Sequence, residues 1–189
     1  MKPPPVNAEP ETVRQEPDQE PDPAVDILIE SEAWQNLPDA GDIARQAIAA
    51  AASAMAASDA GIGLRNVEIS LLLCDDDTIA ALNGRWRGQE KPTNVLSFPA
   101  WPLHGGVMLQ EKRPLGDIAI AYETLVREAR ESGRTASAHL SHLVVHGYLH
   151  LAGYDHETDD EAGEMESLER DILAQIGVAD PYAACDADI

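Results

Sequence analysis

At 189 residues and a net charge of −21, the chain is long enough to bury one hydrophobic core, and its overall charge opposes unspecific binding to nucleic acid. The acidic side chains concentrate at the two ends, because residues 43–154 carry 11 acidic and 10 basic residues, so a local basic cleft remains feasible. No stretch is apolar enough for a membrane span, the first residues lack a signal-peptide pattern, and Cys74 and Cys185 match no disulfide or metal-site spacing, so we expect a cytoplasmic protein without membrane contact.

The first 23 residues are rich in Pro, Glu, Asp and Gln and contain almost no large apolar side chains. Such a segment cannot bury enough apolar surface to fold, so we expect an acidic disordered tail over residues 1–23. We expect a single domain over residues 24–182 and a flexible C-terminus over residues 183–189.

Hydrophobic periodicity predicts, in chain order, a strand at 25–30, a helix at 42–58, a strand at 67–74, a short helix ending at 83, strands at 94–99 and 115–121, and helices at 122–133, 135–153 and 159–176. Asp42 is expected to cap the first helix, and one of Asp75, Asp76 and Asp77 the second, because carboxylates are favoured at the positive end of a helix. The predicted fold class is α+β, with a small four-stranded mixed sheet packed against about five helices.

Three histidines in the run HGYLHLAGYDH predict a metal site. His146 and His150 are four residues apart, so they lie on one face of the predicted central helix, about 6 Å apart along its axis. Gly153 can end that helix in a left-handed conformation and bring His156 back as a third ligand. Three neutral imidazoles leave a fourth position open, as in catalytic zinc sites, so we expect one zinc ion on the central helix and the turn after it. Imidazoles also bind nickel and other divalent ions, so the metal itself stays open at this point.

This spacing matches the HExxHxxGxxH motif of the metzincin proteases at every position but one. Those enzymes use the glutamate directly after the first histidine as a general base, and here that position is Gly147. Glycine cannot accept a proton, so peptide hydrolysis by that mechanism is not expected. A metallopeptidase would have to recruit a distant base such as Glu157 or Glu164.

The remaining histidines are not expected to bind the ion. His142 lies one turn before His146 and is interpreted as a residue that supports the site or packs beside it. A ligand set that included His142 would leave the turn around Gly153 unexplained. His104 and His139 have no spacing argument and receive no role.

Five basic residues fall in two segments that read as loops and could converge into a phosphate-binding cleft: Arg85, Arg87, Lys91, Lys112 and Arg113. The plainer interpretation is scattered surface charge.

Four blocks together resemble the YbeY family of bacterial zinc-dependent endoribonucleases: RWR followed by KPTNVLSFP, then LGDIAIA, HLVVHGYLHLAGYDH, and an acidic helix ending near DPY. The resemblance covers roughly residues 25–182. It implies a metal-dependent, single-strand-specific endoribonuclease that acts in maturation of the 16S ribosomal RNA 3′ end and in ribosome quality control. It also implies contact with the small ribosomal subunit and its assembly factors, and no DNA substrate.

By position in these blocks, the resemblance implies His146, His150 and His156 as zinc ligands and Arg87 as a catalytic arginine. A guanidinium can hold a phosphate oxygen and stabilise charge that grows in the transition state. Asn94 stands where the family usually has aspartate, and we expect that position to have a structural role.

The general acid or base is not assigned by the sequence. Asp155 is expected to orient a ligand or cap the turn, because histidines that bind metal usually have a carboxylate or carbonyl partner. Asp117 is a second candidate. Two other functions stay open, a metallopeptidase-like hydrolase and a non-catalytic ribosome assembly factor stabilised by zinc.

Overall fold

The computed structural model describes residues 23–57, 67–100 and 113–183. The predicted tail over residues 1–23 and the predicted flexible C-terminus over residues 183–189 fall almost wholly outside the described residues. His104, Lys112 and Cys185 lie outside them as well.

Four strands form one mixed sheet, as the sequence predicts. They are β1 (Ala24–Ile29), β2 (Val67–Cys74), β3 (Val95–Pro99) and β4 (Arg113–Ala121). Their order across the sheet is β1-β2-β4-β3, with β1, β2 and β4 parallel and β3 antiparallel to β4. Among the described strands, β3 therefore lies at the edge of the sheet and is hydrogen-bonded to β4 on one side.

Five α-helices accompany the sheet in the described residues: α1 (Ala40–Ala56), α2 (Asp76–Arg87), α3 (Tyr122–Glu131), α4 (Ala136–Leu151) and α5 (Asp159–Gln175). The predicted α+β class, with four strands and about five helices, is confirmed. A short 3₁₀ helix, η1 (Glu32–Asn36), is not predicted by the periodicity.

The start of α1 differs from the sequence prediction. The helix begins at Ala40, and Asp39 occupies the position before it without a side-chain hydrogen bond to the first turn. Asp42 therefore lies inside the first turn, where its charge still faces the positive end of the helix, and it is not the cap.

The second helix is capped as predicted but runs further. The Asp75 carboxylate accepts a backbone N–H of the first turn at 2.8 Å. The helix continues past Asn83 to Arg87 and ends where Gly88 adopts a left-handed φ of 71°. Arg85 and Arg87 therefore belong to the last helical turn, and the prediction that they lie in a loop is wrong.

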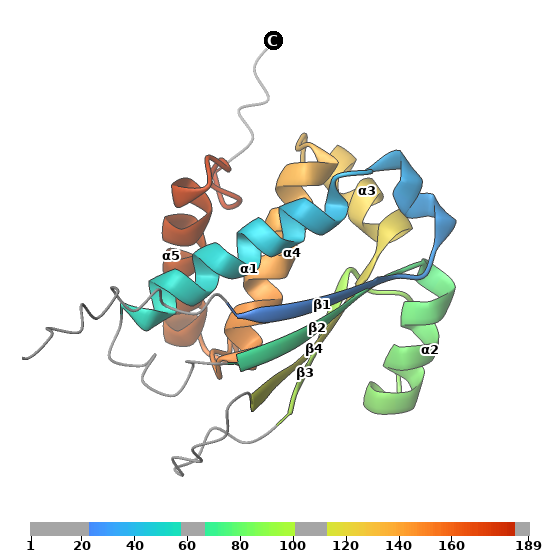
Figure 1. The fold of residues 1–189 in the computed structure, drawn as a ribbon, viewed down its shortest axis with the longest axis horizontal. Helices are drawn as coiled ribbons and strands as arrows, with labels where there is room; N and C mark the ends of the chain where they lie inside the picture. The colour runs from blue at the N-terminus through green and yellow to red at the C-terminus, as the bar shows by residue number, and fades with distance from the viewer. Residues whose placement is uncertain (1–22, 58–66, 101–112, 184–189) are drawn as a thin grey trace, which may run out of the picture.

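Helices cover both faces of the sheet (Figure 1). Helices α1, α4 and α5 lie over one face, and α2 lies against the other. Alternation along the strands produces this arrangement, because Leu73 joins the large core under α1 and α4 while Cys74 joins a smaller core with Ile79 of α2. In β3, likewise, Ser97 contacts α4 and Phe98 contacts α2.

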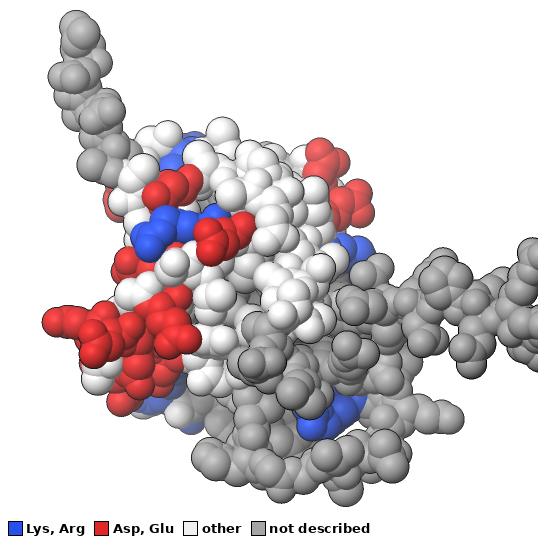
Figure 2. Space-filling view, turned by 90° about the vertical axis from the view of Figure 1, so that its left-hand side faces the viewer, with Lys and Arg blue, Asp and Glu red and all other residues white. Residues whose placement is uncertain are grey.

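Acidic side chains gather on the side of the molecule that carries α5 (Figure 2). The first turn of that helix contributes Asp159, Asp160 and Glu161. Such a patch repels phosphate groups. Among the described residues, no helix has both the length and the apolar character that crossing a bilayer requires.

Candidate metal centre

The C-terminal end of α4 and the turn after it bring three histidines together. Gly153 has a φ of 96°, the left-handed conformation that the sequence predicts. Its N–H donates to the carbonyl oxygen of His150 at 3.1 Å, which closes the last turn of the helix. The chain then reverses, and His156 returns to the side of α4 that carries His146 and His150.

The three rings converge on one point. The Nε2 atoms of His146 and His150 are 3.1 Å apart. The ring centroid of His156 lies 5.0 Å from that of His150 and 5.5 Å from that of His146. One nitrogen from each ring can be chosen so that all three lie within 4.8 Å of one another. His156 is exposed and the other two are half-buried, so the centre opens to solvent on one side.

Hydrogen bonds determine which nitrogens of His146 and His150 carry a hydrogen. Nδ1 of His146 lies 2.8 Å from Oε1 of Glu169, and Nδ1 of His150 lies 3.0 Å from the carbonyl oxygen of Tyr154. Both partners accept hydrogen bonds, so each Nδ1 is the donor and each Nε2 of a neutral ring is bare. Burial, with the charges of His146 and His156, lowers the pKa of His150, which keeps that ring neutral.

The Nε2 atoms of His146 and His150 are 3.1 Å apart, and with both rings in these tautomers a cation bound by the two nitrogens would remove the repulsion between their lone pairs. Neutral imidazole nitrogens are also common ligands of divalent metals. The donor atoms and their tautomers therefore fit a metal ion bound by three imidazoles, with one side left open.

Glu169 of α5 is a buried acid behind these histidines. Only 1% of its side-chain surface is exposed, and its Oε2 accepts hydrogen bonds from Nε2 of His142, at 2.9 Å, and from the hydroxyl of Tyr182. Burial alone would raise the pKa of this carboxyl, but the hydrogen bonds from His142, His146 and Tyr182 lower it to about 2. Glu169 is therefore ionised at neutral pH.

Sequence reasoning missed Glu169. Helix α5 is acidic over most of its length, so one more glutamate gives no signal of its own, and apolar periodicity points only to the apolar residues of the buried face. The position of Glu169 in the helix could have indicated burial. Glu169 comes one turn after Met165 and one turn before Ile172 and Leu173, and these three apolar residues are buried. A charged residue at a buried position usually has a partner.

His139 and His142, the two other histidines in the described part of the chain, lie outside the three-ring group. His142 contacts Glu169, which agrees with the interpretation that it supports the site. His139 is buried near the N-terminal end of α4, with its Nε2 3.0 Å from Oε2 of Glu128.

The two aspartates considered as general acid or base have other surroundings. Oδ1 of Asp155 accepts the backbone N–H of His156 at 2.8 Å, so it shapes the turn that carries this histidine. Asp117 is exposed on β4, next to Ile118, whose side chain packs under Gly147 of α4. Successive strand residues point to opposite faces, so Asp117 points away from α4 and the histidines.

Arg87 lies across the sheet from the histidines. It is exposed at the end of α2, and its neighbour Trp86 has its ring 6.0 Å from that of Phe98 in β3. The adjacent residue Ser97 donates a hydrogen bond of 3.3 Å to the carbonyl oxygen of Gly147 in α4. Arg87 and the histidine-bearing helix therefore flank the same edge strand from opposite faces.

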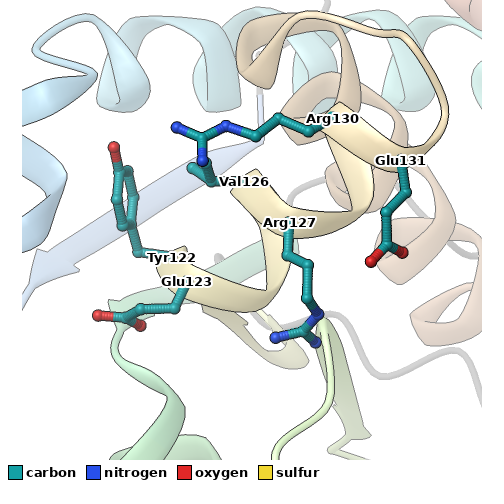
Figure 3. A pocket seen from close by; sticks show the side chains of 6 residues that line it. All are labelled: Tyr122, Glu123, Val126, Arg127, Arg130 and Glu131. Carbon is teal, nitrogen blue, oxygen red and sulfur yellow. The ribbon is translucent and has the colours of Figure 1, made fainter.

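A separate shallow pocket of about 470 Å³ lies along α3 (Figure 3). Its lining comes from that one helix: Tyr122, Glu123, Val126, Arg127, Arg130 and Glu131. Arg127 is already 3.8 Å from the carboxylate of Asp76. The pocket contains no histidine of the metal-binding group, and we assign it no part in the centre.

Fold and centre together define a class of protein, a small α+β domain in which three imidazoles from one helix end and its turn can hold a metal ion open to solvent. The model of the family described as "Endoribonuclease YbeY" matches residues 29–177. The chain belongs to the endoribonuclease YbeY family.

Several proteins named endoribonuclease YbeY are close relatives. One from Bradyrhizobium sp. (strain BTAi1) is 53% identical over 166 residues, which cover 87% of this chain and 95% of the relative. One from Nitrobacter winogradskyi is 53% identical and covers 85% and 83%, and one from Azorhizobium caulinodans is 52% identical and covers 84% and 96%. A solution structure of a Thermotoga maritima protein aligns at 25% identity with a TM-score of 0.43, over 81% of this chain and 91% of that one.

Proposed function

We propose that this chain is a zinc-dependent endoribonuclease that cleaves single-stranded RNA. His146, His150 and His156 hold one zinc ion, and Arg87 is a catalytic residue. The observation that carries the proposal is the convergence of the three rings, with the Nε2 atoms of His146 and His150 3.1 Å apart and one nitrogen of each ring within 4.8 Å of the others. Membership of an endoribonuclease family supplies the class of reaction.

The zinc ligands and Arg87 would have separate roles in the cleavage of a phosphodiester bond. Zinc at this centre would activate water or polarise a phosphoryl oxygen. The hydrogen bonds at Nδ1 of His146 and His150 hold both rings in the orientation and tautomer that a cation requires. Arg87 would bind a phosphate oxygen in a bidentate fork and offset the charge that grows there.

Charge placement favours approach of RNA from the side of β3. The acidic first turn of α5 excludes phosphates from its own side of the molecule. Arg85 and Arg87 end α2, and Lys91 lies in the loop before β3. A strand of RNA that crosses the β3 edge would meet these cations and the open side of the histidine centre.

The proposal extends to the cellular role that the sequence resemblance implies. We expect action on the 3′ end of 16S ribosomal RNA and in ribosome quality control, with the small ribosomal subunit and its assembly factors as partners, in the cytoplasm. We also retain the expected division into a disordered tail over residues 1–23, a catalytic domain over residues 24–182 and a flexible C-terminus over residues 183–189.

Peptide hydrolysis by the metzincin mechanism is disfavoured by the surroundings of Gly147, whereas a peptidase with a distant base such as Glu157 or Glu164 remains the competing hypothesis. A Cβ atom at this position would lie 3.1 Å from the hydroxyl oxygen of Ser97 and 3.1 Å from a methyl group of Ile118. The position that bears the general base in metzincins therefore points into the packed layer between α4 and the sheet. No carboxylate fits there.

The proposal is tested with RNA cleavage and zinc content measured on the same preparations. Arg87→Ala should keep one zinc per chain and cut single-stranded RNA about 100-fold more slowly, the usual cost of losing one group that stabilises transition-state charge. His150→Ala should lose both zinc and cleavage. Arg130→Ala, which removes an exposed arginine of α3, is the matched control and should cut like wild type.

Two results would contradict parts of the proposal. If Arg87→Ala cuts as fast as wild type, its catalytic role is wrong. If wild-type protein binds zinc but cleaves no RNA, and loses its circular dichroism signal when a chelator removes the metal, the ion is structural and the chain is a zinc-stabilised assembly factor.

A further inference from the structure

A hydrogen-bond network around the buried Glu169 connects the histidine centre with the turn that carries Tyr182. Oε1 of Glu169 accepts a hydrogen bond of 2.8 Å from Nδ1 of His146. Oε2 of Glu169 accepts one of 2.9 Å from Nε2 of His142 and another from the hydroxyl of Tyr182. The two carboxylate oxygens of Glu169 thus have different partners. Oε1 is hydrogen-bonded to a histidine of the three-ring group, and Oε2 is hydrogen-bonded to residues outside that group.

The turn that supplies Tyr182 is itself fixed to the domain. The guanidinium of Arg134 donates to the carbonyl oxygen of Pro181, and the backbone N–H of Tyr182 donates to Oδ1 of Asp180 at 2.8 Å. The guanidinium of Arg170 lies 5.7 Å from the centre of the Tyr182 ring. The phenol therefore approaches Glu169 from a constrained direction.

We propose that Glu169 is a positioning residue of the metal centre, which fixes the ring and tautomer of His146 and is itself held in place by His142 and Tyr182. The inference rests on the proposed function, because it assigns Nε2 of His146 to the ion. A carboxylate at Nδ1 keeps the hydrogen there, so Nε2 stays bare and aimed at His150 and His156. It also makes the imidazole a stronger electron donor toward a cation.

A second metal ion held by His142, His146 and Glu169 is the competing explanation, since their ligand atoms also lie within 4.8 Å of one another. The distances favour hydrogen bonds. Nδ1 of His146 and Nε2 of His142 lie 2.8 and 2.9 Å from the carboxylate oxygens of Glu169, which are ordinary hydrogen-bond distances. The hydroxyl of Tyr182 donates to the same carboxylate. His146 would also have to give up the hydrogen on Nδ1 to bind two ions.

The test compares three variants by zinc affinity, measured with a competing chelator, and by the tautomer of His146, read from nitrogen-15 NMR of the metal-free protein. Glu169→Gln keeps the volume but replaces one acceptor oxygen with a donor, and it should weaken zinc binding about 10- to 100-fold. Tyr182→Phe removes one donor to Glu169 without touching a histidine of the centre. It should weaken zinc binding about 2- to 10-fold, and it carries the test if Glu169→Gln does not fold.

Glu166→Gln is the matched control, because Glu166 lies one turn earlier on α5 and pairs with Arg170 at 3.9 Å on the surface. It should bind zinc like wild type. In wild type and in this control, His146 should carry its hydrogen on Nδ1, whereas Glu169→Gln should give a mixture of tautomers.

The inference is overturned if Glu169→Gln and Tyr182→Phe both bind zinc within twofold of wild type. It is also overturned if wild type binds two zinc ions and Glu169→Gln loses one of them. Failure of the proposed function looks different, since wild type would then bind zinc, depend on Glu169 for its affinity, and still leave RNA intact.

Discussion

Asn94 is held by hydrogen bonds to both atoms of its amide. Its Oδ1 accepts the backbone N–H of Val95 at 2.7 Å, and its Nδ2 donates to Oε2 of Glu128 at 2.9 Å. The same carboxylate oxygen lies 3.0 Å from Nε2 of His139. These contacts explain why an amide fits at the start of β3, and they agree with the structural role expected from the sequence.

Replacing Asn94 with aspartate should destabilise the domain at pH 7. The carboxylate keeps the acceptor for Val95 but loses the donor to Glu128 and places two negative charges together. We expect the free energy of unfolding in urea to fall by about 1–3 kcal/mol. Combining Asn94→Asp with Glu128→Gln restores a donor and should recover part of the loss. An Asn94→Asp protein as stable as wild type would show that this pairing is unimportant.

The convergence of His146, His150 and His156 could be predicted from their spacing in the sequence alone. A period of four residues places His146 and His150 on one helix face, and Gly153 has the backbone conformation that the reversal toward His156 needs. Their role as ligands stays a prediction. Glu169 could not be paired with them from the sequence, because 23 residues separate it from His146 and only the packing of α5 against α4 brings them together.

Gly147 sets how closely α4 approaches the sheet. It is a buried helical glycine, and an added Cβ would lie 3.1 Å from atoms of Ser97 and Ile118. The hydroxyl of Ser97 also donates to the carbonyl oxygen of Gly147 across this contact. Glycine is thus required here by close packing between two elements.

Gly147→Ala should therefore destabilise the domain, by about 1–3 kcal/mol, because α4 must move away from β3 and β4. The matched control is Gly163→Ala in α5, where an added Cβ meets nothing within 4 Å. That change should stabilise the helix by about 0.5–1 kcal/mol, since alanine loses less backbone freedom than glycine. Thermal unfolding measures the change in stability caused by Gly147→Ala and by Gly163→Ala. Changes of the same sign and size in the two variants would contradict this packing argument.

The elements themselves were predicted best where one signal dominates. Strand β2, Val67–Cys74, has the predicted bounds because apolar and polar residues alternate at its start and four apolar residues in a row follow. The end of α2 was placed too early because the polar residues after Asn83 lack apolar periodicity, and the deciding residue is Gly88 with its left-handed conformation. The 3₁₀ helix η1 is too short for a periodic pattern, and its one buried side chain, Trp34, donates to the carbonyl oxygen of Cys74 at 2.9 Å.

For the whole molecule, the α+β class followed from the number and order of elements, but their arrangement in space did not. The order β1-β2-β4-β3 depends on pairing between strands distant in sequence, and local patterns do not encode it. That order makes β3 an edge strand, with α4 over one face of the sheet and α2 against the other. Through this topology α2, which ends at Arg87, and α4, which carries His146 and His150, both pack against β3 from opposite faces.

The most direct test of a zinc-dependent endoribonuclease is to strip the wild-type protein of metal and add zinc back while measuring cleavage of a single-stranded RNA. Three imidazoles that form one centre predict that the stripped protein is inactive and that cleavage rises with added zinc to a plateau at one ion per chain. Stripped protein that cuts RNA at the full rate would contradict the account.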